Sequence, residues 1–312
     1  MKKGIILIYT DLSDQWLELL SKAGFNTVGL HTLYQCGGVQ GLLDWLALPE
    51  TQALLARFEA RGITIEYQLH AVDWLLPRNL FDAHPNWFRE SDGRRIGDWN
   101  LCVSNEEALS YLEQSAYRLA CQLKQKPHDY FIWPDDCLNS ICRCGQCSAL
   151  SGADQSMIIT NRILRGLKRY DPQARLSFLA YQDALTIPTI APEDGVFLEF
   201  APIDRNHHAP LAGDDPANIK VRQMLSGLLD IFPADSAQIL EYFLDVSLFC
   251  KWKKEDATAL NLDEERLASD IGWYRAQGVA GITTFAGFID AQWLEKYGDD
   301  DILLYGNVLN QK

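Results

Sequence analysis

The stretch GIILIYTDLSDQWLELLSKAGFNTVGL, residues 4 to 30, decides the fold class. Its first six residues, Gly4 to Tyr9, form a short apolar run of the kind that makes a buried strand. Ser13 to Ala23 then has apolar residues at helical spacing, and Thr27 to Leu30 is a second short apolar run. The order strand, helix, strand predicts a βαβ unit with parallel strands.

The same alternation continues along the chain. Further strands are predicted at Ile63 to Leu69, Tyr130 to Trp133, Leu176 to Tyr181, Val196 to Phe200, Gln238 to Phe243 and Gly281 to Phe285. Helices are predicted at Leu42 to Arg61, Glu106 to Lys124, Ser156 to Tyr170, Ile219 to Leu229 and Leu262 to Gln277. Eight strands separated by helices predict an α/β fold, a (β/α)8 TIM barrel, and the 312 residues exceed the typical length of about 250. We expect one catalytic domain over residues 1–312, with long insertions after strands 3 and 4 at about 71–105 and 134–155.

Two Rossmann-like domains are the competing architecture. No G-x-G-x-x-G follows a predicted strand and no G-x-x-x-x-G-K-S/T occurs, so the sequence supports neither that fold nor an organic nucleotide cofactor. A hydrophobic content of 47% with 22% charged residues is typical of a soluble globular protein. The formal charge of -14 disfavours nucleic acid and anionic membranes as partners.

The N-terminus predicts a cytoplasmic protein. Met1-Lys2-Lys3 precedes an apolar run that is too short for a signal peptide and lacks a small-residue cleavage site. No run of about 18 apolar residues is present, so no transmembrane helix is expected. The sequence does not indicate an oligomeric state.

Polar residues follow almost every predicted strand, where a barrel builds its active site. They are Tyr9, Asp11, His31, His70, Asp73, Asp135, Asp136, Tyr181, Gln182, Glu199, Glu241, Tyr242, Thr283 and Thr284. Strands often end where the chain becomes polar, so no single position is informative. Together, however, carboxylates and histidines predominate and lysine is absent, which indicates acid-base chemistry.

Asp135 and Asp136 are the sharpest catalytic candidates. Two neighbouring carboxylates push their pKa values apart, so that one holds a proton near neutral pH. The alternative is an Asp-Asp turn that caps the next helix. Glu199 and Glu241 lie within apolar strand sequences and need a polar lumen or a partner. His31 and His70 either bind substrate hydroxyls or are ordinary polar groups of the rim.

Four cysteines have spacing typical of a metal site. Cys142, Cys144 and Cys147 form C-x-C-x2-C, and Cys102 in the preceding predicted insertion is a candidate fourth ligand for a structural zinc. Such an all-thiolate site leaves no open position for water. Iron-sulfur ligation, disulfides and buried free thiols remain alternatives.

Residues 84 to 147 resemble a known family. The segments HPNWFRESDGRR, NLCVSNEE and IWPDDCLNSICRCGQC, with the later ILEYFLD segment and Trp252, are similar to a glycosidase-like domain family. This family was long described as of unknown function and includes endo-β-N-acetylglucosaminidases. The resemblance runs from the first strand to about Thr284, and its most specific parts are His-Pro-x-Trp-Phe, Leu-Cys and C-x-C-x2-C.

The resemblance implies a (β/α)8 barrel related to hexosaminidases and α-glucuronidases, with acidic catalysts at the ends of strands four and seven. In the related hexosaminidases one carboxylate orients the 2-acetamido group, which is the nucleophile, and the next is the general acid and base. Asp135 and Asp136 match that order. The chain lacks the secretion signal and carbohydrate-binding modules of glycan-degrading enzymes, so small imported oligosaccharides or glycosides are the expected substrates.

The sequence therefore predicts a glycoside hydrolase that cleaves β-N-acetylhexosaminide or related bonds. Asp136 is the expected acid/base and Asp135 the residue that orients the acetamido group. Glu241 stabilises charge or, without an acetamido group, serves as nucleophile or base. The expected substrate-binding residues are His31, His70, Tyr181, Glu199, Tyr242 and Trp252. Two alternatives stay open: a metal-dependent sugar isomerase or epimerase that uses the histidines with Glu199 and Glu241, and a non-catalytic sugar-binding barrel.

Overall fold

The barrel predicted from the sequence is confirmed. The structure is a computed structural model that describes residues 1–311. Eight parallel strands form a closed barrel in the order β1-β10-β9-β8-β7-β6-β3-β2. The barrel strands are β1 (Lys2–Ile8), β2 (Thr27–His31), β3 (Thr64–His70), β6 (Asp129–Trp133), β7 (Arg175–Ala180), β8 (Val196–Phe200), β9 (Gln238–Glu241) and β10 (Gly281–Phe285). Each of the eight predicted strands overlaps one of them.

The chain divides into two compact units. The first unit comprises Met1–Cys36, Asp44–Glu66 and the chain from Phe200 on, and the second unit comprises Gly37–Leu43 and Tyr67–Glu199. The two units are described separately below. That the whole chain forms a single domain stays a prediction.

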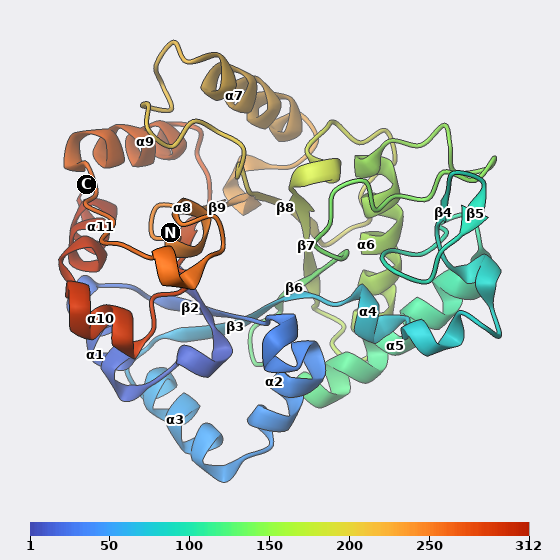
Figure 1. Ribbon diagram of the computed structural model, residues 1–312, viewed down its shortest axis with the longest axis horizontal. Helices are drawn as coiled ribbons and strands as arrows, with labels where there is room; N and C mark the ends of the chain where they lie inside the picture. The colour runs from blue at the N-terminus through green and yellow to red at the C-terminus, as the bar shows by residue number, and fades with distance from the viewer. Residues whose placement is uncertain (312) are drawn as a thin grey trace. The chain divides into compact units, whose positions relative to one another are not determined.

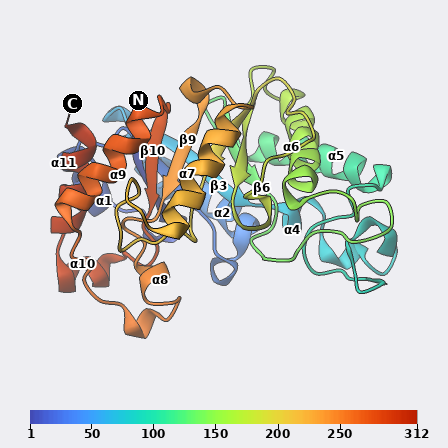
Figure 2. The ribbon, with the colours of Figure 1, turned by 90° about the horizontal axis from the view of Figure 1, so that it is seen from above.

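In the first unit, β1 pairs in parallel with β2 and β10, and β10 pairs with β9. Gly4 permits the close pairing of β1 with β2, because a Cβ at this position would lie 2.6 Å from the carbonyl oxygen of Thr27. The helices are α1 (Asp14–Ala23), α3 (Pro49–Ala60), α7 (Pro216–Leu229), α8 (Val246–Phe249), α9 (Glu264–Ala276), α10 (Ala291–Tyr297) and α11 (Asp300–Asn310). Helices α9 and α11 lie side by side (Figures 1 and 2).

In the second unit, β6 pairs in parallel with β3 and β7. The helices are α2 (Gly38–Leu46), α4 (Val72–Leu75), α5 (Glu106–Leu123) and α6 (Gly152–Lys168), and a small antiparallel pair consists of β4 (Glu90–Ser91) and β5 (Arg94–Arg95). Helices α5 and α6 pack closely against each other (Figure 1). Gly166 makes this possible, since a Cβ there would lie 2.2 Å from the carbonyl oxygen of Glu113.

Short 3-10 helices occupy several connections. They are η1 (Tyr9–Asp11), η2 (Tyr34–Cys36), η3 (Arg78–Leu80), η4 (Pro85–Trp87), η5 (Gln182–Ala184), η6 (Ala234–Ser236) and η7 (Lys254–Asp256). Two of them, η3 and η4, lie with β4 and β5 in the segment 71–105, which was predicted as an irregular insertion.

The helix predicted over Leu42 to Arg61 is wrong as a single element. The structure has two helices there, α2 and α3, separated at Ala47 and Leu48. Pro49 is the cause: it disfavours helical backbone at the preceding residue, and Leu48 is extended with ψ 134°. The same proline then begins α3 at a position that needs no N–H donor. Helices α4, α8, α10 and α11 were not predicted.

No helix within residues 1–311 is both long enough and apolar enough to cross a membrane.

Candidate functional site

The predicted aspartate pair follows β6 at the carboxyl end of the strand. The side chain of Asp135 is only 5% exposed, whereas Asp136 is exposed. The pair does not cap the next helix, because α6 begins after Ser151, whose hydroxyl accepts the Asp154 N–H in a capping box. The two carboxylates therefore occupy different environments.

Asp135 is held by groups from the segment that follows β3. Its Oδ2 pairs with the guanidinium of Arg78, and its Oδ1 accepts the backbone N–H of Asp73 at 3.0 Å. The backbone N–H of Asp135 donates to Asn100 Oδ1 at 2.9 Å. Each carboxylate oxygen has a second lone pair, so Asp135 keeps acceptor capacity for a ligand.

Burial raises the pKa of Asp135 to about 6. Arg78 acts in the opposite direction, because its positive charge favours the ionised carboxylate. Asp73 adds a smaller upward effect through like charge. Asp135 therefore changes protonation in the pH range where many enzymes work. Arg78 keeps the pKa of Asp135 from rising further.

We expect Arg78→Gln to raise the pKa of Asp135 above about 6, because the cation that lowers it is removed. A raised acid pKa means that the folded state binds the proton more tightly, so Asp135 disfavours folding increasingly as pH rises from about 4 through the folded pKa. In Arg78→Gln the loss of folding stability continues to a higher pH, because the pKa of Asp135 in the folded state is higher. Carboxyl-carbon NMR titration measures the pKa directly, with Arg169→Gln as an exposed control, and an unchanged pKa would contradict the assignment.

Asp136 is positioned by the turn that follows β7. The amide of Gln182 donates to Asp136 Oδ1 at 3.1 Å and to the Tyr181 hydroxyl at 2.8 Å. Gln182 has φ 46°, in the left-handed region that disfavours residues other than glycine. Such strained residues concentrate at functional sites, and here the strain accompanies a contact with the exposed aspartate.

A small pocket joins several of the predicted residues within the second unit. Its cavity volume is about 30 Å³, and its lining includes His70, Asn100, Asp135, Tyr181 and Gln182. Nδ1 of His70 contacts the carbonyl oxygen of Pro134 at 2.5 Å. A volume of this size holds about one water molecule.

Glu199 and Glu241 are both buried, and they lie in separate units. Glu199 is the residue before the last of β8, and Glu241 is the last residue of β9. In the first unit, Glu241 is completely enclosed. Its Oε1 lies 2.9 Å from Arg205 Nε and accepts the Tyr274 hydroxyl at 2.6 Å. Arg205 also pairs with Asp270 at 2.9 Å. A glutamate within an apolar strand needs a polar lumen or a partner, and Arg205 is that partner for Glu241.

We expect Glu241→Gln to destabilise the protein by about 3 kcal/mol, because it leaves Arg205 buried with a weaker partner set. Urea unfolding measures the effect, with Glu295→Gln on the exposed face of α10 as the matched control. A variant as stable as the wild type would mean that the buried charges do not depend on one another.

The other predicted binding residues of the first unit have different environments. The ring of His31 packs edge-on against Phe285 at 5.2 Å, and Tyr242 packs against His207 at 6.1 Å. Trp252 is 61% exposed and, like Lys251 before it, has a left-handed backbone, with φ 59°. An exposed indole on a strained turn is suited to stacking on a flat ligand.

The four predicted cysteine ligands come together in the second unit, and we call Cys102, Cys142, Cys144 and Cys147 the cysteine group. All four are buried, and their sulfur atoms lie within 4.8 Å of one another. None forms a disulfide. The Cys102 sulfur lies 3.7 Å from that of Cys144 and 3.9 Å from that of Cys147. Tetrahedral ligation with metal-sulfur bonds of about 2.3 Å requires separations of about 3.8 Å. The group can therefore hold a metal ion.

Hydrogen bonds connect the segments that carry the cysteine group to the His-Pro-x-Trp-Phe motif and the residues that follow it. The N–H of Cys102 donates to the carbonyl oxygen of Trp87 at 2.8 Å, and the sulfur of Cys142 accepts the N–H of Glu90 at 3.3 Å. The hydrogen bonds within the group lower the pKa of Cys102 and raise the pKa of Cys142 and Cys147. The His-Pro-x-Trp-Phe motif thus supports the cysteine group and does not reach the aspartate pair.

Several residues of these sites were not identified from the sequence. Arg78, Asn100 and Arg205 complete the surroundings of the carboxylates, and Gln155 bonds to the backbone of Cys142 on both sides, at 2.9 and 2.8 Å. Each is one polar residue in a helix or loop, and no spacing marks it. Cys137, next to the aspartates, is not part of the cysteine group.

A protein-family model described as a domain of unknown function (DUF4838) matches residues 44–252, about two thirds of the chain. The matched range contains the aspartate pair, the cysteine group and Glu241. This match agrees with the predicted resemblance to a family that was described as of unknown function. No curated protein is similar enough to be matched to this chain.

Solved structures with the same fold include glycoside hydrolases. A β-N-acetylhexosaminidase from Bacteroides fragilis NCTC 9343 is 12% identical with a TM-score of 0.59, and the match covers 98% of this chain and 65% of that one. This chain therefore spans slightly less than two thirds of that enzyme. An endo-β-1,4-glucanase from Xanthomonas axonopodis pv. citri, crystallised with three substitutions, is 12% identical with a TM-score of 0.57 and full coverage of both chains. A β-galactosidase from Marinomonas ef1 is 11% identical with a TM-score of 0.56, over 98% of this chain and 59% of that one. At such identities the likeness bears on the fold alone.

Proposed function

The chain belongs to the family described as a domain of unknown function (DUF4838), and on that premise we propose that it is a glycoside hydrolase that cleaves β-N-acetylhexosaminide or related bonds. One observation carries the proposal: two adjacent aspartates after β6 have opposite environments, one buried on a cation and one exposed. The glycosidase-like barrel and the resemblance to a family with endo-β-N-acetylglucosaminidases support it.

In the proposed mechanism Asp136 is the general acid and base. Its carboxylic acid donates a proton to the glycosidic oxygen as the bond from that oxygen to C1 breaks. The carbonyl oxygen of the substrate's own 2-acetamido group forms the new bond to C1. The Asp136 carboxylate then takes a proton from water, whose oxygen attacks C1 and releases the acetamido group. The exposure of Asp136 suits a group that must meet both substrate and water.

Asp135 orients the acetamido group by accepting its N–H. The contacts of Asp135 with Arg78 and with the Asp73 N–H fix the carboxylate in one orientation, as this role requires. Acceptance needs the ionised form, so we infer that the rate falls at pH values below the pKa of about 6. His70 and Tyr181, which line the same pocket, are proposed to bind the sugar.

In this proposal Glu241 is a positioning residue, whereas the sequence predicted a catalytic role for it. Its complete burial against Arg205 and Tyr274 favours positioning of the end of β9 over contact with the substrate. Tyr242, Trp252, His31 and Glu199 remain proposed substrate-binding residues, and Trp252 is the most exposed of them.

We further propose that the cysteine group binds one structural zinc ion. Four thiolates at tetrahedral separations suit zinc and leave no position for a substrate or a water molecule. Its contribution would be to hold together the segments around Cys102 and Cys142. Within residues 1–311 this is also the one group of three or more His, Cys, Asp or Glu side chains close enough to hold a metal, so no observation favours the metal-dependent isomerase.

A panel of chromogenic glycosides tests the proposed function. The wild-type protein is expected to hydrolyse a 2-acetamido-2-deoxy-β-glycoside and to leave the matching 2-hydroxy glycoside intact, because the latter lacks the internal nucleophile. The panel includes glucosides, galactosides and glucuronides. Equal rates on the acetamido and hydroxy substrates would remove the substrate-assisted mechanism, and the absence of any hydrolysis would overturn the proposed function.

A further inference from the structure

The first unit contains a cavity of about 490 Å³ that none of the predicted site residues lines. It is formed by two segments, one after β8 that carries His207 and His208 and one after β9 that runs from Val246 to Arg266. Connections after barrel strands are where barrels bind their ligands. The volume lies within the range of about 300 to 1,000 Å³ that is usual for small-molecule sites.

Arg266 supplies a positive charge to this cavity. Among the described residues its guanidinium forms no ion pair with a carboxylate, and its one hydrogen bond, to the carbonyl oxygen of His208, is long at 3.5 Å. Arg205 in the same unit, by contrast, pairs with two carboxylates. Asp263 also lines the cavity, but its carboxylate accepts the backbone N–H of Arg266 at 3.0 Å and caps α9. The guanidinium therefore retains its capacity to bind an anion.

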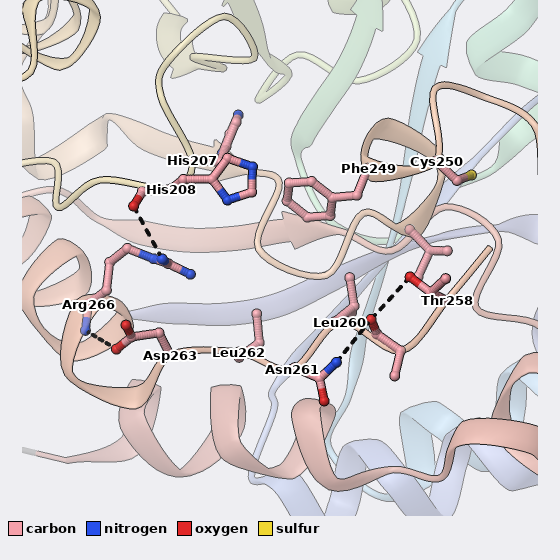
Figure 3. Close-up of a pocket in the computed structure, with 12 residues that line it drawn as sticks. His207, His208, Phe249, Cys250, Thr258, Leu260, Asn261, Leu262, Asp263 and Arg266 are labelled. Carbon is pink, nitrogen blue, oxygen red and sulfur yellow. Dashed lines mark hydrogen bonds between the residues drawn. The ribbon is translucent and has the colours of Figure 1, made fainter. Parts of the chain in front are cut away.

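His207 and Phe249 form another part of the wall. Figure 3 shows their rings facing each other, and they meet edge to face at 5.8 Å. Burial lowers the pKa of His207, which favours the neutral imidazole. Its Nε2 lies 2.9 Å from the carbonyl oxygen of Ile203 and must donate there, which leaves Nδ1 as an acceptor. That Nδ1 atom is buried and has no hydrogen-bond partner among the described residues.

These groups match one class of ligand. A guanidinium binds a carboxylate through two parallel hydrogen bonds, and an exposed phenyl ring such as that of Phe249 packs on the apolar face of a sugar. Arg266 and Asp263 are the charged side chains of the lining, so an anion binds here through the hydrogen bonds of the guanidinium and not through a net positive charge of the cavity.

We propose that this cavity is a binding site for an acidic sugar, with the carboxylate of the sugar on Arg266 and its ring against Phe249. That the occupant is a sugar rests on the proposed function, whereas its negative charge follows from Arg266 alone.

Binding measurements test the proposal independently of turnover. Isothermal titration of the full-length protein with methyl β-D-glucuronide, methyl β-D-glucoside and methyl β-D-glucoside 6-phosphate compares a carboxylate, a neutral group and a phosphate on one ring. The wild type is expected to bind the glucuronide at least tenfold more tightly than either other ligand, since the difference is one charge-assisted pair of hydrogen bonds.

Arg266→Gln is expected to lose this preference, with glucuronide binding weakened at least tenfold and glucoside binding unchanged. Arg266→Lys keeps the charge without the planar geometry and is expected to be intermediate, and Arg169→Gln is the exposed control. Melting temperatures show whether each variant is folded. No glucuronide binding by the wild type, equal binding of all three ligands, or tighter binding of the phosphate would each overturn the proposal. Failure of the proposed function has a different signature, since glucuronide binding would persist without hydrolysis of any glycoside.

Discussion

Replacing Asp136 by asparagine is expected to reduce kcat/KM on the best glycoside about a hundredfold to ten-thousandfold. An amide cannot donate the proton that the leaving oxygen requires, and general acid catalysis contributes an effect of about that size. The substitution leaves the local structure intact, because the contact of Asp136 with Gln182 is a single hydrogen bond at the surface. The loss should be smallest for substrates whose leaving group departs without protonation, such as dinitrophenyl glycosides.

The matched control for this prediction is Asp194→Asn. Asp194 is exposed and lies just before β8, at the end of the strands opposite to the aspartate pair. This variant should keep the wild-type rate on every substrate. Equal activity of Asp136→Asn and the wild type on any glycoside would disprove the assignment of the acid. If Asp136→Asn lowers kcat/KM by the same factor on dinitrophenyl glycosides and on glycosides whose leaving group needs protonation, the defect does not lie in proton transfer.

Replacing Cys144 by serine is expected to abolish metal binding and to lower the melting temperature by about 10 °C or more. A structural metal couples its binding free energy to folding, and the loss of even about 5 kcal/mol produces a shift of that size in a chain of this length. The effect should be large because the segments around Cys102 and Cys142 contain only short elements, such as β4 and β5. Elemental analysis should find about one zinc per wild-type chain and none in the variant.

Cys121→Ser is the control for the cysteine group, because Cys121 lies on α5 and outside the group. It should retain both the zinc and the melting temperature. A chelator that removes the zinc should lower the melting temperature of the wild type to that of Cys144→Ser. If the purified protein contains iron and sulfide in place of zinc, or if Cys144→Ser melts like the wild type, the zinc proposal is wrong.

The barrel was predictable because its signal is local. Each strand is a short apolar run bounded by turn residues, and each helix has apolar residues at helical spacing, as in Thr27–His31 and Asp14–Ala23. The error at residues 42 to 61 also has a local cause. The apolar spacing on both sides of Pro49 matches one continuous helix, and the prediction gave that spacing more weight than the proline.

The candidate sites were predictable only in part. The Asp135-Asp136 dipeptide and the C-x-C-x2-C spacing are visible in the sequence because their members are neighbours in the chain. Arg78 is 57 residues from Asp135, and Arg205 and Tyr274 approach Glu241 from opposite directions along the chain. No spacing rule connects such residues, because their proximity is produced by the packing of the barrel strands and their connections.

The sequence by itself determined the barrel, the position of the acidic pair after its fourth strand and the four cysteines that can meet. Only the tertiary structure decided the state of each group: Asp135 is buried against Arg78, Asp136 is exposed, Glu241 is enclosed with Arg205 and the Tyr274 hydroxyl, and Arg266 has no ion pair among the described residues. The physical reason is that secondary structure follows from the pattern of neighbouring residues, whereas the charge and hydrogen bonding of a side chain depend on burial and on partners that are distant in sequence.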